Sequence, residues 1–208
     1  MRVLFPMLVA AALLAAACSD PTANLARATT GSAAEVTRAE GKTLKFSHEG
    51  SAVEFVGSKV TGTHKGGFKA FRGTAIISDD GSKLLQVEVE INVDSIWTDD
   101  PSATNEKLTG HLKSGDFFDA ANHPKAKFVS TEIKAGGEGG THTLTGNLTM
   151  RGITKGISFP ANVTLQGGKL TADAAFKVNR KDFGMKYDGK ADNLIRDDVG
   201  ITLKVSAS

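Results

Sequence analysis

The stretch LQVEVEINV, from Leu85 to Val93, alternates apolar and polar residues without a break. Successive side chains of a β-strand point to opposite faces of a sheet, so this period of two predicts a strand with one buried and one solvent-facing side. The apolar residues from Leu85 to Val93 are therefore expected on the buried face. A strand that is wet on one side is typical of an antiparallel sheet.

The same period recurs on both sides of this stretch, and turn signals such as Gly167-Gly168 separate the repeats. About eight strands result, which is the number at which an antiparallel sheet commonly closes into a barrel that can hold a small ligand. The predicted fold is all-β, an eight-stranded antiparallel barrel. Its other strands are expected at Val53–Val60, Phe68–Ser78, Ala126–Ile133, Leu144–Met150, Ile157–Leu165, Leu170–Val178 and Val199–Val205.

One connection breaks the strand pattern. Asp99-Asp100-Pro101-Ser102 offers a helix cap and a first-turn proline, and Leu108 and Leu112 then share one helical face. A short helix is predicted from Ser102 to Lys113, followed by a loop with the paired rings of Phe117 and Phe118. A long connection of this kind is where a barrel would place a lid.

The N-terminus reads as a targeting segment. Arg2, an apolar run to Leu14 and three alanines precede Cys18, the single cysteine of the chain. This pattern is typical of a secretory signal peptide over residues 1–17, because the run is too short to span a membrane. Cys18 stands where a bacterial lipobox places its lipidated residue, which predicts a membrane anchor; a plain signal peptide is the alternative.

The predicted location is the cell envelope. Ser19 after the cysteine resembles the signal for the outer membrane under the bacterial sorting rule. Residues 18–41 are rich in Ala, Ser and Thr and are expected to form a flexible tether, because they offer little apolar surface to bury. The barrel domain is assigned to residues 42–208.

The amino-acid composition limits which classes of binding partner are expected. The 25 Lys and Arg residues nearly balance 23 Asp and Glu residues, and no basic run is interleaved with aromatics. A nucleic-acid partner is therefore not expected. Eleven Phe residues against one Tyr and one Trp favour a core or an apolar pocket over a polar site.

Inward-facing apolar residues suggest a binding tunnel. Small inward residues, such as Gly146, Ala172 and Ala174, are expected to leave room inside the barrel. A solid core is the alternative, which composition alone favours. The residues expected to line or gate the tunnel are Phe55, Phe71, Val87, Val89, Ile91, Trp97, Leu108, Leu112, Phe117, Phe118, Phe128, Leu148, Ala174 and Phe176.

Polar residues offer competing hypotheses. His111, Asp116, Asp119 and His123 could bind zinc, although their spacing matches no established ligand motif and capping explains them equally well. A small metal-dependent enzyme therefore stays open as an alternative.

Two other polar pairs have simpler explanations. Lys59 and His64 could meet a ligand's head group or form a solvent-facing turn. Arg180 and Asp182 are expected to pair across a strand end.

Three long segments resemble a known family. HLKSGDFFDAANHPKAKF (His111–Phe128), LTGNLTMRGITKGISFP (Leu144–Pro160) and NRKDFGM (Asn179–Met185) are similar to signature stretches of the YceI-like family, and the likeness runs from about Leu44 to Val205. The resemblance implies a lipocalin-like barrel in the periplasm or outside the cell, whose interior holds an isoprenoid or other long-chain lipid. It implies no catalytic residue and no further cofactor. A structural envelope module without ligand is a third possibility, and oligomeric state is left open.

Overall fold

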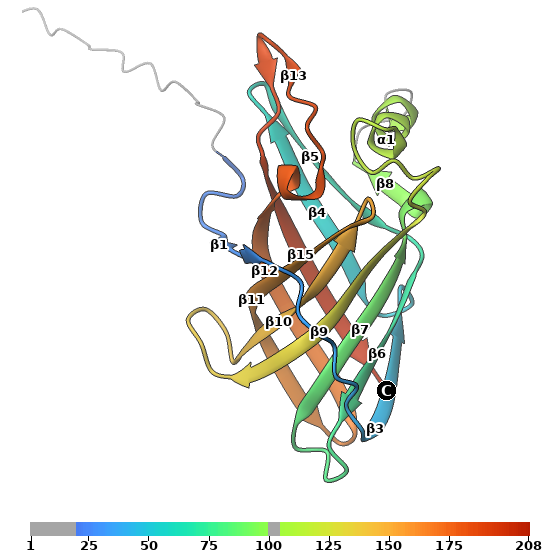
Figure 1. Ribbon diagram of the computed structural model, residues 1–208, viewed down its shortest axis with the longest axis vertical. Coiled ribbons are helices and arrows are strands. Elements are labelled where there is room, and N and C mark those ends of the chain that lie inside the picture. The colour runs from blue at the N-terminus through green and yellow to red at the C-terminus, as the bar shows by residue number, and fades with distance from the viewer. Residues whose placement is uncertain (1–19, 100–104) are drawn as a thin grey trace, which may run out of the picture.

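The computed structural model describes residues 20–99 and 105–208, so the predictions for the signal peptide, Cys18 and the first residues of the helix lie outside the described residues. The described chain is a curled antiparallel sheet with one α-helix, α1, at one end (Figure 1). Its elements are β1 (Ala26–Arg27), β2 (Thr29–Gly31), β3 (Lys42–Ser47), β4 (Ala52–Lys59), β5 (Gly62–Phe68), β6 (Phe71–Ile77), β7 (Leu84–Asn92), η1 (Val93–Ser95), β8 (Ile96–Thr98), α1 (Asn105–Lys113), β9 (Lys125–Ala135), β10 (His142–Met150), β11 (Ile153–Gln166), β12 (Lys169–Asn179), η3 (Arg180–Phe183), β13 (Gly189–Lys190), β14 (Asn193–Leu194) and β15 (Asp198–Ala207).

The sheet closes into a barrel at the end opposite α1. Neighbouring strands run in the order β3-β6-β7-β9-β10-β11-β12-β15. Lys45 and Ser208 exchange backbone hydrogen bonds of 3.0 and 3.2 Å, which join β3 to the end of β15. The predicted all-β, lipocalin-like antiparallel barrel is thus confirmed. We call this end the closed end and the end beside α1 the open end.

The strand count differs from the prediction because short strands that were not predicted adjoin the predicted ones at bends of the chain. Only Lys69 and Ala70 separate β5 from β6, and only η1 separates β7 from β8. At one side of the sheet, β3 pairs with β6 and bonds the end of β15, whereas β4, β5 and β8 continue the sheet from β15 around the open end. The predicted strands Val53–Val60, Phe68–Ser78 and Leu85–Val93 appear as β4, β6 and β7, whereas β3, β5 and β8 were not predicted.

A β-bulge moves one predicted inward residue to the surface. The pairing of β6 with β7 shifts register between Ile76 and Ile77. As a result Leu84 is buried, whereas Leu85 is 37% exposed. The prediction that Leu85 lies on the buried face is wrong, because a bulge adds one residue and reverses the alternation beyond it.

Within the segment predicted as a flexible tether, residues 26–31 form two short strands, β1 and β2. The sheet splits above the pairing of Asn162 with Asp173, leaving strand edges on β11 and β12. β1 pairs in parallel with β12, and β2 pairs antiparallel with β11, so both edges gain backbone partners. Backbone hydrogen bonds to the sheet hold this segment. The flexible tether was predicted only from the apolar surface that the segment could bury, and backbone pairing does not depend on that surface. We call residues 20–31 the N-terminal clasp.

Glycines on the wall make room for phenylalanine rings. A Cβ at Gly73 would collide with the ring of Phe46, and a Cβ at Gly146 would collide with the ring of Phe128. Gly146 therefore leaves space for a side chain of the protein itself, which corrects the expectation that it opens the interior. Such pairing of a glycine with an aromatic ring is a known device for strongly curved sheets.

Candidate functional site: an apolar cavity at the open end

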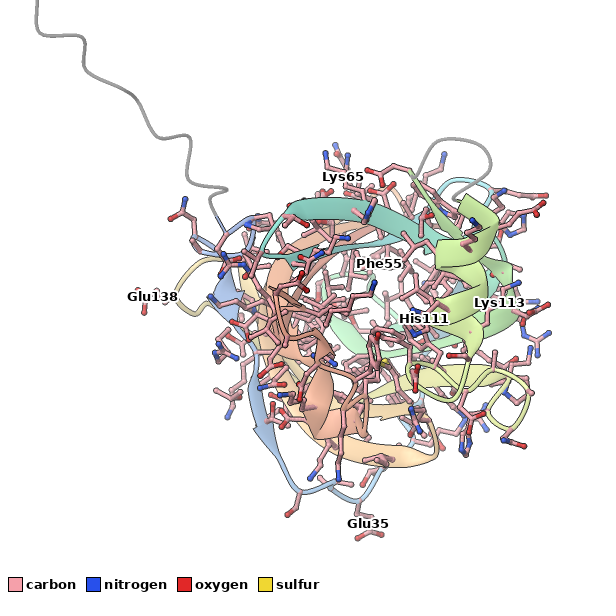
Figure 2. The ribbon with its side chains drawn as sticks, turned by 90° about the horizontal axis from the view of Figure 1, so that it is seen from above. Glu35, Phe55, Lys65, His111, Lys113 and Glu138 are labelled. Atoms are coloured by element: carbon pink, nitrogen blue, oxygen red, sulfur yellow. The ribbon has the colours of Figure 1, made fainter. Side chains whose placement is uncertain are left out.

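A cavity of about 510 Å³ occupies the open half of the barrel. Its wall comes from β4, β5, β7, β9–β12 and β15, with α1 and the loop after it along one side of the mouth (Figure 2). The volume falls within the range of pockets that hold small organic ligands. The interior of the barrel is therefore hollow at one end, which answers the question left open by the sequence.

Three phenylalanine rings close the bottom of the cavity. The ring of Phe159 lies 5.6 Å from that of Phe128 and stacks on that of Phe176 at 4.2 Å between centroids. All three side chains are at most 8% exposed. We call this group the aromatic floor. Its members belong both to the cavity lining and to the packed hydrophobic core, so the floor lies between the two.

Most of the predicted tunnel residues line this cavity. The mouth residues come from α1 and the following loop, as expected, and the others come from inward positions of the strands. The predicted residues that line the cavity are Phe55, Val89, Ile91, Leu108, Leu112, Phe117, Phe118, Phe128, Leu148 and Phe176.

Four predicted residues lie elsewhere. Phe71, Val87 and Ala174 pack in or against the hydrophobic core and are not among the residues that line the cavity. Trp97 lines a separate surface depression with His48 and other residues, because alternation along β8 turns its neighbour Thr98 inward instead. Ala172 likewise packs against the core.

Several lining residues were not named as site residues from the sequence. Ile157 and Phe159 were expected to face inward, and a floor could have been suspected from their position. Tyr187, Met185 and Ile195 come from an irregular segment whose approach to the mouth has no periodic signal. Further lining residues lie in predicted strands but were not named as site residues: Phe68, Met150, Val178, Ile201 and Leu203.

Aromatic contacts join the two sides of the mouth. The ring of His111 on α1 lies 4.9 Å from the rings of both Phe117 and Tyr187. Arg151 secures the loop from the other side, because its guanidinium donates to the carbonyl oxygens of Gly115 and Phe117 at 2.7 and 2.6 Å. The segment after α1 is thus fixed over the cavity by hydrogen bonds and ring contacts.

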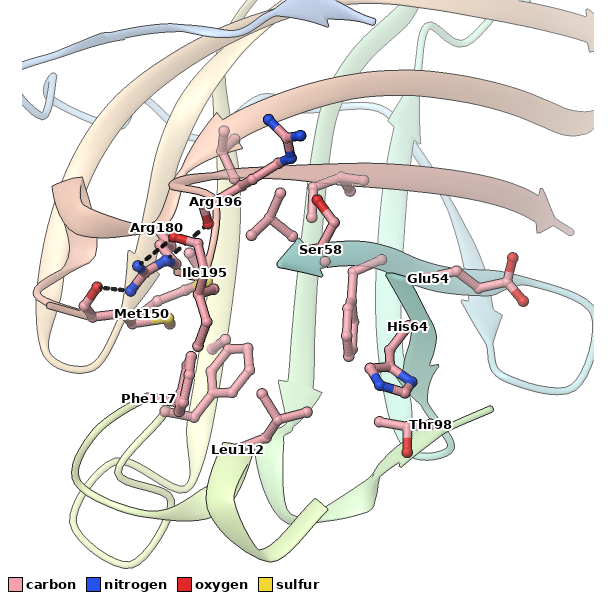
Figure 3. A pocket seen from close by; sticks show the side chains of 18 of the residues that line it. Glu54, Ser58, His64, Thr98, Leu112, Phe117, Met150, Arg180, Ile195 and Arg196 are labelled. Carbon is pink, nitrogen blue, oxygen red and sulfur yellow. Dashed lines mark hydrogen bonds between the residues drawn. The ribbon is translucent and has the colours of Figure 1, made fainter. Parts of the chain in front are cut away.

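One polar atom inside the cavity lacks a partner. Ser58 lines the wall and is 7% exposed, and its hydroxyl makes no hydrogen bond to any described residue (Figure 3). Lys59 and His64, which the sequence suggested for a head group, also line the cavity near this point. The His64 Nδ1 lies 3.4 Å from the Asp99 carboxylate. A buried hydroxyl without a partner is unfavourable, so a polar ligand atom here would be stabilising.

Arg180 holds the rim segment in place. Its side chain is 3% exposed and donates to the carbonyl oxygens of Met185, Arg196 and Ile195 at 2.6, 3.2 and 3.4 Å. It also bonds the Asp197 carboxylate at 3.2 Å. The expected pair with Asp182 is therefore wrong: the chain after η3 folds back and supplies the partners instead.

The four polar residues considered for a metal form two separate pairs. His111 lies 2.9 Å from Asp116, and His123 lies 3.9 Å from Asp119. Across residues 20–99 and 105–208, no group of three or more His, Cys, Asp or Glu side chains is arranged to hold a metal ion. In the same ranges, no helix is long and apolar enough to cross a membrane.

Fold and cavity together define a lipocalin-like barrel with one apolar internal cavity that opens at one end. Residues 44–207 match the model of the YceI-like domain. The chain belongs to this family, as the resemblance of its three signature stretches indicated.

Curated relatives support the same assignment. The chain is 32% identical over 142 residues to a UPF0312 protein of Pseudomonas putida strain GB-1, an alignment that covers 65% of this chain and 71% of the relative. It is 34% identical over 129 residues to a UPF0312 protein of Pseudomonas paraeruginosa strain PA7, an alignment that covers 59% of this chain and 64% of the relative.

Solved structures share the fold. BcnA of Burkholderia cenocepacia is 25% identical and has a TM-score of 0.64, with 76% of this chain and 96% of that chain covered. A polyisoprenoid binding domain from Saccharophagus degradans, described as implicated in plant cell wall breakdown, has a TM-score of 0.58 at 14% identity. The alignment covers 80% of this chain and 99% of that chain. At that identity the second likeness shows the fold alone.

Proposed function

We propose that this protein is a non-enzymatic carrier that binds an isoprenoid or other long-chain lipid in the apolar cavity of its barrel, for sequestration or transport in the cell envelope. The observation that carries the proposal is the cavity of about 510 Å³ above the aromatic floor, in a barrel of the YceI-like family. The polyisoprenoid-binding structural neighbour supports this choice of ligand class.

The lining explains how a lipid would be held. Phenylalanine, leucine, isoleucine and valine side chains make up most of the wall, so burying a hydrocarbon chain would contribute about 25 cal/mol per Å² of apolar area. The unpartnered Ser58 hydroxyl lies among these side chains. A lipid whose polar end carries a hydroxyl, carbonyl or phosphate oxygen would satisfy it, with the hydrocarbon pointing toward the aromatic floor.

The anchor forms the second part of the proposal. A thioether-linked diacylglycerol on Cys18 would hold the barrel on a membrane after export, because several acyl chains give stable attachment. The outer membrane is the proposed site. A Cys18→Ser variant is then expected in the soluble envelope fraction, and its retention on membranes after a high-salt wash would contradict the anchor.

Lipid extraction tests the cavity. The Cys18→Ser protein, purified without detergent, is expected to release a co-purifying lipid that mass spectrometry identifies, or to take up an added polyprenol. Phe117→Ala is an informative companion at the mouth, and Val36→Ala, a change at an exposed position on the outer surface, is the control. A wild-type protein that carries no lipid and binds no polyprenol would overturn the proposal.

A further inference from the structure

Two hairpins project beside the mouth of the cavity. The first, residues 59–65, joins β4 to β5; the second, residues 186–196, contains β13 and β14 (Figure 1). We call them the rim hairpins. The Val60 amide donates to the Leu194 carbonyl at 3.1 Å, and Thr61 bonds Asn193 at 2.9 Å. The two hairpins therefore form one connected tip.

This tip exposes apolar side chains. Val60 is 55% exposed and Leu194 is 49% exposed, and they lie on directly hydrogen-bonded residues. Among the described residues, only Val36 and Leu85 are other large aliphatic side chains with comparable exposure. Neighbouring positions of the tip line the cavity, including Lys59, Lys190 and Asn193. The apolar tip therefore adjoins the ligand entrance.

Positive charge surrounds the apolar tip. The rim hairpins carry five Lys or Arg residues against two Asp residues, a net charge of +3. Lys59 and Lys190 form no ion pair with any described residue, whereas the Asp188 carboxylate is bound by Lys181 at 2.8 Å. That contact lowers the pKa of Asp188 and raises the pKa of Lys181. Free cations beside exposed aliphatic side chains suit the surface of an anionic phospholipid bilayer.

The N-terminal clasp begins at the same end of the barrel. Asp20 lies 3.8 Å from Arg196, which is only two residues from Leu194. Thr22 is fully buried, and its carbonyl accepts a hydrogen bond from Lys177 at 3.1 Å. Cys18 is two residues before Asp20, a span of at most about 7 Å. A lipid on Cys18 would therefore enter the membrane beside the rim hairpins.

We propose that the rim hairpins dock on the bilayer surface, with Val60 and Leu194 in the interfacial region, so that the mouth of the cavity faces the membrane that holds the anchor. This inference rests on the proposed function. Two aliphatic side chains are too few to bind a membrane alone, so the covalent lipid provides attachment and the tip provides orientation. A carried lipid then passes between cavity and bilayer without crossing bulk water.

Site-specific fluorescence tests the orientation. The full-length lipidated chain carries a bimane label at Leu194→Cys or at Leu85→Cys and is reconstituted in vesicles of phosphatidylethanolamine and phosphatidylglycerol that contain a brominated phosphatidylcholine. Leu85 is the matched control, because it is a similarly exposed leucine at the closed end. We expect strong quenching and a blue shift at position 194 and little change at position 85. Equal quenching at both positions, or none at position 194, would overturn the docking.

Charge substitutions give a second, independent readout. Lys59→Gln with Lys190→Gln is expected to reduce quenching at position 194, whereas Lys83→Gln at the closed end leaves it unchanged. Undiminished quenching in the double variant contradicts the electrostatic contribution.

The same preparations separate the two proposals. Bimane labelling of the wild-type chain reports a free Cys18 thiol, and solvent extraction reports a carried lipid. A protein that is anchored and carries lipid but shows no quenching at position 194 refutes the docking alone. A free thiol or an empty cavity counts against the proposed function itself.

Discussion

Both ends of the barrel are built from strands in which apolar and polar residues alternate, but one end has a packed interior and the other contains a cavity. At the closed end, Ala75, Ile77 and Leu170 are at most 1% exposed and belong to one packed hydrophobic core. At the open end, Phe55, Val89 and Leu148 also face inward, yet they surround a cavity of about 510 Å³. Periodicity therefore determines which side chains face the interior, but not whether they touch.

The aromatic floor and the bent strands produce this difference. At the closed end, β3 completes the ring through its backbone bonds with Ser208. At the open end, β8 is the last strand in the order of paired strands, and α1 stands beside the mouth (Figure 2). Hydrogen bonds from the buried Arg180 side chain also hold the rim segment at the open end.

The largest expected effect comes from the boundary between the ends. Phe159→Ala removes the central ring of the floor and is expected to lower the free energy of unfolding by about 3 to 5 kcal/mol, because a buried aromatic ring leaves a cavity. Denaturant unfolding measures the loss. Phe118→Ala, at the partly buried mouth, is the control and is expected to cost less. Equal losses would show that the two ends are packed alike.

A matched pair of tryptophans probes each interior directly. Ala174→Trp enters the packed core below the floor and is expected to destabilise the fold by about 1 to 3 kcal/mol through overpacking. Leu148→Trp enters the cavity and is expected to displace lipid with a smaller change in stability. Thermal unfolding and lipid extraction on the same samples distinguish them. The comparison fails if Ala174→Trp is tolerated and Leu148→Trp retains its lipid.

A smaller effect is expected from the orphan hydroxyl. Ser58→Ala removes a possible hydrogen bond to the ligand and is expected to weaken binding of a polyprenol by about 0.5 to 1.5 kcal/mol, up to roughly tenfold. Fold stability should stay the same or rise, because an unsatisfied buried group is lost. Titration with a polyprenol measures the affinity. Unchanged affinity would place the polar end of the ligand elsewhere.

The smallest effect concerns the clasp at the open end. Hydrogen bonds from the Thr22 amide and then the Thr22 hydroxyl lower the pKa of Asp20. A carboxyl with a lowered folded-state pKa contributes stability above its unfolded pKa and loses it as the pH falls through the folded value. Acidification below about pH 4 should therefore loosen residues 20–25 selectively, with reduced hydrogen-exchange protection at Thr22. Asp20→Asn should remove this pH dependence; a clasp that responds identically in both proteins refutes it.

Sequence patterns predicted the fold where they were local and regular. The alternation from Ile157 to Leu165 is confirmed by β11, and the described part of the helix, residues 105–113, lies within the predicted range. Predictions from the local pattern failed where contacts with a strand distant in the sequence determine the structure. The bulge beside Leu85 and the split of the sheet that receives the clasp both depend on partner strands, which no local window contains.

The candidate site followed the same division. The inward orientation of Val89 and Leu148 was predictable, because both lie in segments where apolar and polar residues alternate. That of Tyr187 and Ile195 was not, because they come from an irregular segment that Arg180 holds at the mouth. Which inward residues reach the cavity was not predictable either, because Phe71 pairs with Ile91 on the neighbouring strand, yet of these two only Ile91 lines the cavity. Membrane location and lipidation stay predictions.

The positions of the two rarest aromatic residues equip this protein with internal optical probes. Tyr187 is the single tyrosine and lies in the wall of the mouth, whereas Trp97 is the single tryptophan and lies outside the cavity, against Gly67. A ligand that enters the barrel should therefore perturb the absorbance and ring resonances of Tyr187 and leave the emission of Trp97 as an internal reference. Occupancy could be followed in real time on the unlabelled wild-type chain.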